Sequence, residues 1–178
     1  MKKHYLQFLS IIMATAALAS AAYAQSSFWA EAARGGSAEV TMARLALTKA
    51  AAPSVKAFAQ KLIDEHTVMN QQLKALAAAK KVALPTDMAN RDELSMKTLN
   101  GLTGKEFDAE FVKQMIKSHE LAVMLFRRAS VSETDGELKA FAVKNLPKLQ
   151  EHLKAARAMG PVLPATTNKK MKKPAGGA

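Results

Sequence analysis

Four long stretches of the sequence carry apolar residues at every third or fourth position, which is the spacing of one face of an α-helix. These stretches cover residues 28–51, 53–81, 103–128 and 134–159. A shorter helix is expected over 90–100, ahead of Gly101. No stretch shows the strict alternation of apolar and polar residues that a half-buried strand requires. The sequence therefore predicts an all-α fold.

The lengths of the connections indicate how the four long helices are joined. Short links after the first and third helices favour two antiparallel hairpins. The connection over residues 82–103 contains the short helix and is long enough to run from one end of a bundle to the other. We therefore expect a ferritin-like antiparallel four-helix bundle with a long crossover. A plain up-down-up-down bundle is the alternative.

Local residue choices predict where the helices begin. Pro53 suits the first helical position, where its missing N–H is not needed. Thr103 with Glu106, and Thr134 with Glu137, have the spacing of a capping box. In that motif the threonine hydroxyl accepts a hydrogen bond from a backbone N–H of the first turn. We therefore expect Thr103 and Thr134 to cap the third and fourth long helices.

Residues 1–24 have the features of a secretory signal peptide. Lys2 and Lys3 precede an apolar run from Phe8, and residues 22–24 form an A-x-A cleavage signature. The apolar run is shorter than the roughly 20 residues of a membrane-spanning helix, although an uncleaved anchor is the alternative. We expect cleavage after Ala24 and a periplasmic or secreted mature protein.

Residues 161–178 differ in composition from the rest of the chain. They follow a helix stop at Gly160, lack an apolar period and include four lysines, so we expect a disordered basic tail. The bundle domain is then 25–160. The tail could contact an anionic membrane surface weakly, or be solvated without a partner. The formal charge of +11 falls to +5 without the lysines of the two ends, so nucleic acid is not an expected partner.

Three of the long helices each carry one histidine within the apolar row. These histidines are His66, His119 and His152. Each has apolar residues one turn before and one turn after it, so each is expected to point into the bundle. A buried imidazole needs a polar partner or a metal ion, because an unpaired buried polar group is costly.

Glu39 on the first helix completes a set of polar residues at one height. In an antiparallel hairpin, residues equally far from the turn lie side by side. Glu39 and His66 are centred on the turn at 52–53, and His119 and His152 on the turn at 135–136. At about 1.5 Å per residue, both pairs lie about 20 to 25 Å from their turns. We therefore expect one carboxylate and three imidazoles to converge near mid-height.

Two interpretations of this set remain open. Glu39, His66, His119 and His152 could bind one transition-metal ion, with zinc, iron and copper as candidates. Alternatively, they form a metal-free hydrogen-bond network within a structural or stress-protective protein of the cell envelope. Four acidic residues adjoin the histidines in sequence and are expected on solvated faces, because neighbouring helix positions point apart. They are Asp64, Glu65, Glu120 and Glu151.

No known catalytic constellation is evident, so a binding or structural role is favoured over catalysis. The absence of cysteine excludes thiolate ligands and cysteine nucleophiles. A ferritin-type di-iron centre needs glutamate three residues before histidine on two helices. Ile63, Ile116 and Leu149 occupy those positions here. A metal-dependent enzyme with an open coordination position is the third option.

Residues 35–85, 102–126 and 138–156 resemble the domain of unknown function 4142 family. The marks of the resemblance are Glu39 after paired glycines, His66 after two acidic residues, Phe107-Asp108, His119, and Leu146-Pro147 ahead of His152. The resemblance implies an exported, ferritin-like four-helix bundle and no established activity. Family members often have aspartate before the second histidine, where this chain has Ser118.

Overall fold

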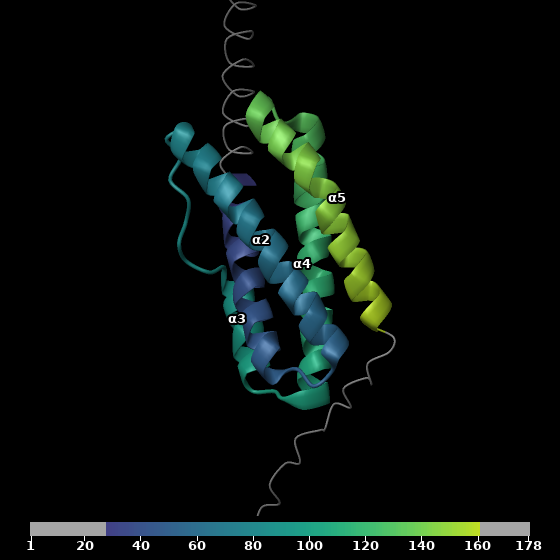
Figure 1. Ribbon diagram of the computed structural model, residues 1–178. Helices are drawn as coiled ribbons and strands as arrows, with labels where there is room; N and C mark the ends of the chain where they lie inside the picture. The colour runs from purple at the N-terminus through teal and green to yellow at the C-terminus, as the bar shows by residue number, and fades with distance from the viewer. Residues whose placement is uncertain (1–27, 161–178) are drawn as a thin grey trace, which may run out of the picture.

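The computed structural model of the protein describes residues 28–160, which form helices joined by turns and loops and contain no strand (Figure 1). The elements are a helix over 28–49, α2 (Pro53–Ala79), α3 (Asn90–Asn100), α4 (Gly104–Ser132) and α5 (Gly136–Met159). The all-α prediction is confirmed, although α4 ends four residues later than expected. The predicted signal peptide and basic tail lie outside the described residues.

The four long helices form two antiparallel hairpins that are joined by a lengthwise crossover (Figure 1). The 28–49 helix descends, α2 rises, and residues 80–103 return to the opposite end before α4 rises and α5 descends. Because α2 and α4 run in the same direction, the predicted ferritin-like connection is confirmed and the up-down-up-down alternative is wrong. No helix of this described part is both long and apolar enough to cross a membrane.

The crossover is held against the 28–49 helix by two ion pairs. Arg34 donates to the Asp87 carboxylate at 2.8 Å, and Arg91 at the start of α3 lies 3.3 Å from Glu31. These contacts position α3 along one side of the bundle, so its first turn lies near the layer of buried polar residues described below.

A carboxylate from α4 organises the turn between the 28–49 helix and α2. Asp108 is buried, and its two oxygens accept hydrogen bonds from the backbone N–H groups of Ala51 at 3.0 Å and Ala52 at 2.8 Å. These amides lie in the short link between helices and have no helical partner of their own. The aspartate of the Phe107-Asp108 pair therefore fixes one end of the bundle.

The capping predictions are wrong in detail at both helices. The N-cap of α5 is Asp135, whose carboxylate accepts from the N–H groups of Glu137 and Leu138, each at 3.0 Å. Thr134 lies one residue too early; an ionised carboxylate also suits the positive end of the helix dipole better than a hydroxyl. Thr103 does occupy the N-cap of α4, but its side chain makes no capping hydrogen bond.

The interior of the bundle contains two separate apolar clusters. The Phe107 cluster includes Met42, Leu62, Leu99, Phe107, Phe111 and Met115. The Trp29 cluster includes Phe28, Trp29, Met69, Phe126, Leu138 and Phe141. On α4, His119 lies between Met115 of the first cluster and Val123 of the second. The predicted histidines therefore form a polar layer that divides the core.

Candidate metal centre

The polar layer takes one residue from each long helix. His66 comes from α2, His119 from α4 and His152 from α5, and Glu39 comes from the 28–49 helix. All four residues are buried, with 3% or less of each residue's surface exposed. The helical period explains this burial, because each residue continues an apolar row that packs against the neighbouring helices.

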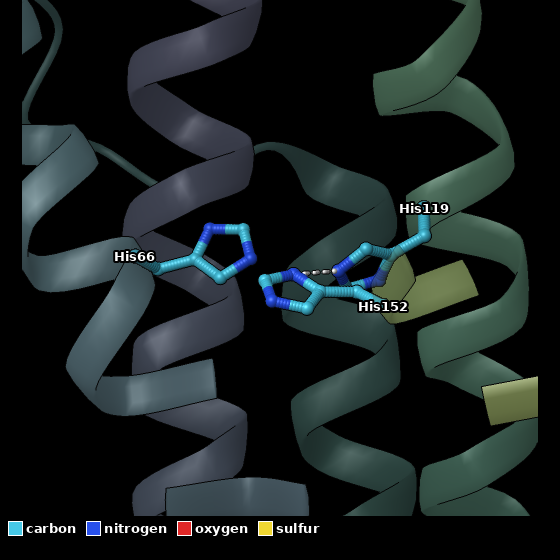
Figure 2. A group of neighbouring side chains, drawn as sticks. All are labelled: His66, His119 and His152. Carbon is cyan, nitrogen blue, oxygen red and sulfur yellow. Dashed lines mark hydrogen bonds between the residues drawn. The ribbon is translucent and has the colours of Figure 1, made fainter. Parts of the chain in front are cut away.

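The three imidazole rings converge on one point, as the sequence predicts (Figure 2). One nitrogen from each ring can be chosen so that the three atoms lie within 4.8 Å of one another. The ring centroids are 5.5 Å apart for His66 and His119, 5.2 Å for His66 and His152, and 5.3 Å for His119 and His152. The three histidines therefore face each other across the bundle axis.

A backbone carbonyl determines which nitrogen of His119 carries its proton. Nδ1 of His119 lies 2.9 Å from the carbonyl oxygen of Met115, one turn earlier in α4. A carbonyl only accepts hydrogen bonds, so Nδ1 is the protonated nitrogen in the neutral ring. Nε2 of His119 is then left with a free lone pair, directed towards His152.

A carboxylate makes the complementary assignment for His152. Its Nε2 lies 2.9 Å from Oε2 of Glu65, which accepts the proton of that nitrogen. Nδ1 of His152 is therefore unprotonated in the neutral ring, and it lies 3.3 Å from Nε2 of His119. Two lone pairs repel each other at this distance, unless a proton or a metal ion lies between them.

Glu39 lies behind two of the rings rather than between them. Its carboxylate oxygens are 3.2 Å from Nδ1 of His66 and 3.4 Å from Nδ1 of His119. Neither Nε2 nor Nδ1 of His66 makes a hydrogen bond among the described residues, although Nδ1 lies near Glu39. The group of mutually close donor atoms thus consists of the three histidines, with Glu39 beside their outer nitrogens.

The protonation states favour ligands over cations at neutral pH. Burial alone would raise the pKa of Glu39, but the nearby His119 and His66 outweigh burial and hold that pKa below its usual value. Burial lowers the pKa of His66, and burial together with the neighbouring imidazoles lowers the pKa of His152 to about 4. Glu39 is therefore ionised and His66 and His152 are neutral, which is the state that metal binding requires.

The spacing of the nitrogens fits a transition-metal ion. Two nitrogens that each lie about 2.0 Å from one tetrahedral ion are about 3.3 Å apart. Nε2 of His119 and Nδ1 of His152 have this separation, 3.3 Å. Metal-binding histidines commonly donate their second N–H to a carbonyl or a carboxylate, as His119 and His152 do here. The nitrogen separation of His119 and His152 and their hydrogen-bond partners therefore suit zinc or copper, with His66 as the third donor of the group.

Glu65 belongs to this centre, although its position in sequence predicted a solvated face. That prediction is wrong for Glu65, because α2 packs beside α5 and turns the flank of its apolar row towards His152. It holds for Glu151 and Glu120, which make ion pairs with Lys61 and Arg157 at the exposed surface. Asp64 is also exposed. The residues next to Glu65 in sequence do not indicate that it contacts His152. Only knowledge of which helices pack together would have predicted the contact.

The fold has solved counterparts, although they are distant in sequence. A Streptomyces coelicolor protein described as secreted and as DUF305 is 15% identical, with a TM-score of 0.66 over 76% of this chain and 91% of that one. CopM in its Cu(I)-bound and Cu(II)-bound forms is 21% identical, with a TM-score of 0.66 over 77% of this chain and 95% of CopM. At these identities the likeness establishes a shared fold alone.

Comparison of the sequence with known families gives a more specific result. No curated protein sequence matches this chain. The model of a domain of unknown function, DUF4142, matches residues 12–159, which include every helix and all four residues of the polar layer. The resemblance inferred from the glycine pair, the histidines and the Phe107-Asp108 pair is thereby confirmed. This chain belongs to the DUF4142 family.

Proposed function

We propose that this protein binds one transition-metal ion outside the cytoplasm, between His66, His119 and His152. The observation that carries the proposal is the 3.3 Å approach of Nε2 of His119 to Nδ1 of His152 within a buried layer, because the outer hydrogen bonds of the two rings leave both of these nitrogens unprotonated. An ion between them converts a repulsion into two coordinate bonds. The unpartnered Nε2 of His66 supplies the third.

Copper is the first candidate for the ion. Imidazole suits zinc, copper, iron and nickel, and among divalent ions copper binds nitrogen ligands most tightly. CopM, which shares this fold, has been solved with Cu(I), Cu(II) and silver bound. That likeness supports copper over zinc for this chain, and zinc and iron are the competitors that a binding experiment must include.

Glu39 and Glu65 have a supporting role in this proposal. We predicted Glu39 as a direct ligand, but its oxygens lie next to the outer nitrogens of His66 and His119. From there it would compensate the charge of a bound ion, as outer carboxylates do in many metal sites. Glu65 accepts a hydrogen bond from His152. Three protein ligands would leave a coordination position open for water or a further ligand.

Export out of the cytoplasm is part of the proposed function. It rests on the predicted cleavage after Ala24 and on the likeness to a protein described as secreted. A metal-binding bundle outside the cytoplasm would bind, carry or sequester copper. Protein isolated from the periplasm or medium should begin at Gln25, and a membrane-bound form that still begins at Met1 would contradict export.

The test of metal binding is a titration of the purified, metal-free mature protein. With Cu(II), and with Cu(I) under anaerobic conditions, we expect one equivalent to bind and zinc to bind more weakly. His119→Ala should lose this equivalent, whereas Asn145→Ala, which changes a buried polar residue outside the layer, should keep it. If the wild-type protein binds no metal, the histidines form the metal-free network instead.

A further inference from the structure

A pocket leads from the surface to the polar layer. It has a volume of about 270 Å³ and opens between the 28–49 helix and α4, beside the start of α3. Glu39 and His66 line it, and so does Ser118. The wall is mostly apolar, and includes Met69 and Leu125. The otherwise dry histidine layer therefore has a side that faces an accessible cavity.

Asp92 on α3 lines the same pocket and is an unusual residue for its position. Asp92 is buried, with 5% of the residue's surface exposed. Oδ1 lies 3.4 Å from Nε of Arg91, but the buried Oδ2 has no hydrogen-bond partner among the described residues. The first turn of α3 favours an acidic residue at this position, but a buried carboxylate oxygen without a donor still destabilises the fold, so the helix end alone does not explain why Oδ2 is unpaired.

Gly35 on the 28–49 helix is the second unexplained residue of the pocket. A Cβ atom added at Gly35 would meet no heavy atom within 4 Å, so packing does not require glycine there. Alanine would also be the better helix former. The adjacent Gly36 differs, because its Cβ would lie 2.1 Å from Oδ1 of Asn70. Gly35 therefore leaves space at the pocket wall that a side chain would fill.

We propose that this pocket is the entrance through which a hydrated divalent cation reaches the histidines, and that Asp92 binds the cation on its way. The proposal rests on the metal-binding function above. The free oxygen of Asp92 can replace one water of the ion before the imidazoles replace others. Arg91 at the mouth is paired with Glu31, at 3.3 Å, and with Asp92, so its charge is largely compensated. Glu39 continues the line of carboxylates towards His66.

The first test measures rates of Cu(II) binding with the whole mature protein. Asp92→Asn should slow Cu(II) uptake roughly tenfold, within the range of electrostatic steering. Release should slow by a similar factor, so that Kd changes little. The matched control is Glu93→Gln, which removes the same charge from an exposed position of the same helix outside the pocket. Stopped-flow absorbance of the Cu(II)–imidazole bands follows both rates.

Two results of this test would overturn the role of Asp92. One is an uptake rate of Asp92→Asn equal to that of Glu93→Gln. The other is a release rate equal to that of the wild type, so that the whole loss in uptake rate appears as a weaker Kd. That result would make Asp92 part of the final binding site. Asp92→Asn should melt close to the wild-type temperature, since Oδ2 of Asp92 has no hydrogen-bond donor to lose and Oδ1 makes only a 3.4 Å contact with Arg91.

A second pair of variants changes the free volume of the pocket and leaves its charge unchanged. Gly35→Leu should fill the wall and slow both uptake and release, and Gly35→Ala should leave both rates nearly unchanged. Equal rates for Gly35→Leu and the wild type would show that the ion enters elsewhere. Failure of the wild type to bind Cu(II) would instead refute the proposed function, so the two failures are distinguishable.

Discussion

Nε2 of His119 lies 3.3 Å from Nδ1 of His152, and the proton of each ring is used on its opposite side. The carbonyl of Met115 accepts a hydrogen bond from Nδ1–H of His119, and the carboxylate of Glu65 accepts one from Nε2–H of His152. The helices hold these partners in place, so the rings cannot change tautomer without losing a hydrogen bond. Several consequences of this arrangement can be measured.

Metal should stabilise the protein, because the ion binds the folded state and the unfolded chain lacks the site. At a free ion concentration of one hundred times Kd the gain is about 2.7 kcal/mol. For a domain of this size that corresponds to a rise in Tm of about 5 to 10 °C. Differential scanning calorimetry with and without Cu(II) measures the rise. It should be absent in His119→Ala, and an equal rise in that variant would place the ion elsewhere.

The size of the residue at position 119 should matter more to the metal-free protein than its polarity. His119→Leu removes one of the two facing lone pairs and fills most of the same space, so it should change the free energy of unfolding by less than about 1 kcal/mol. His119→Ala leaves a cavity and should cost about 2 to 3 kcal/mol. Urea denaturation compares the two. A large loss with leucine would mean that the imidazole itself stabilises the metal-free layer.

The metal-free protein should lose stability as the pH falls from 6.5 to 4. The folded state keeps His152 neutral down to a pKa of about 4, whereas the unfolded chain protonates it near 6.5. Between these values the unfolded state binds more protons, so acid favours unfolding by up to about 3 kcal/mol. Glu39 acts in the same direction at lower pH, because its pKa is lowered in the folded state. Denaturation midpoints at pH 7 and pH 4 test this.

Glu65 and Glu151 form a matched pair for testing the outer carboxylate. Both lie near Lys61, at 3.9 Å and 2.5 Å, but only Glu65 contacts His152. Glu65→Ala should weaken metal binding about 10- to 100-fold, because His152 loses the acceptor that fixes its tautomer. Glu151→Ala should leave affinity nearly unchanged. Titrations of both variants decide the matter, and equal affinities would remove Glu65 from the centre.

Asp108 should matter for stability without affecting the metal centre. Asp108→Ala removes the acceptor of two backbone amides, those of Ala51 and Ala52, and should cost about 1 to 3 kcal/mol. Asp64→Ala is the control, since Asp64 is exposed and bonds only to Gln60 among the described residues. Chemical denaturation measures both, and the metal affinity of the folded Asp108→Ala protein should equal that of the wild type.

The histidine layer could be predicted from the sequence because two regular features determine it. Helical periodicity places His66, His119 and His152 in apolar rows, and the symmetry of a hairpin about its turn determines their heights. Neither feature determines how a helix is rotated relative to an adjacent helix of the other hairpin. Glu65 reaches His152 through that rotation, so its role could not be predicted from its own position.

The position of Asp92 at the pocket could not be predicted from the sequence for a different reason. Asp92 faces the pocket because ion pairs at Arg34 and Arg91 hold the crossover against the 28–49 helix. Those contacts join residues more than fifty positions apart, and no local pattern encodes them. The N-cap at Asp135 was missed by one residue, because the choice between adjacent capping residues depends on the backbone of the turn.

The division of the core into the Phe107 and Trp29 clusters has a consequence for how the protein opens. Each cluster draws on all four long helices, but the layer between them contributes little apolar contact. The two halves of the metal-free bundle can therefore exchange their amide hydrogens in separate opening events of different free energy. An ion held by α2, α4 and α5 at the boundary would join these events into one. The cooperativity of unfolding would then depend on whether an ion is bound to the histidine layer: the two halves open separately without the ion and together with it.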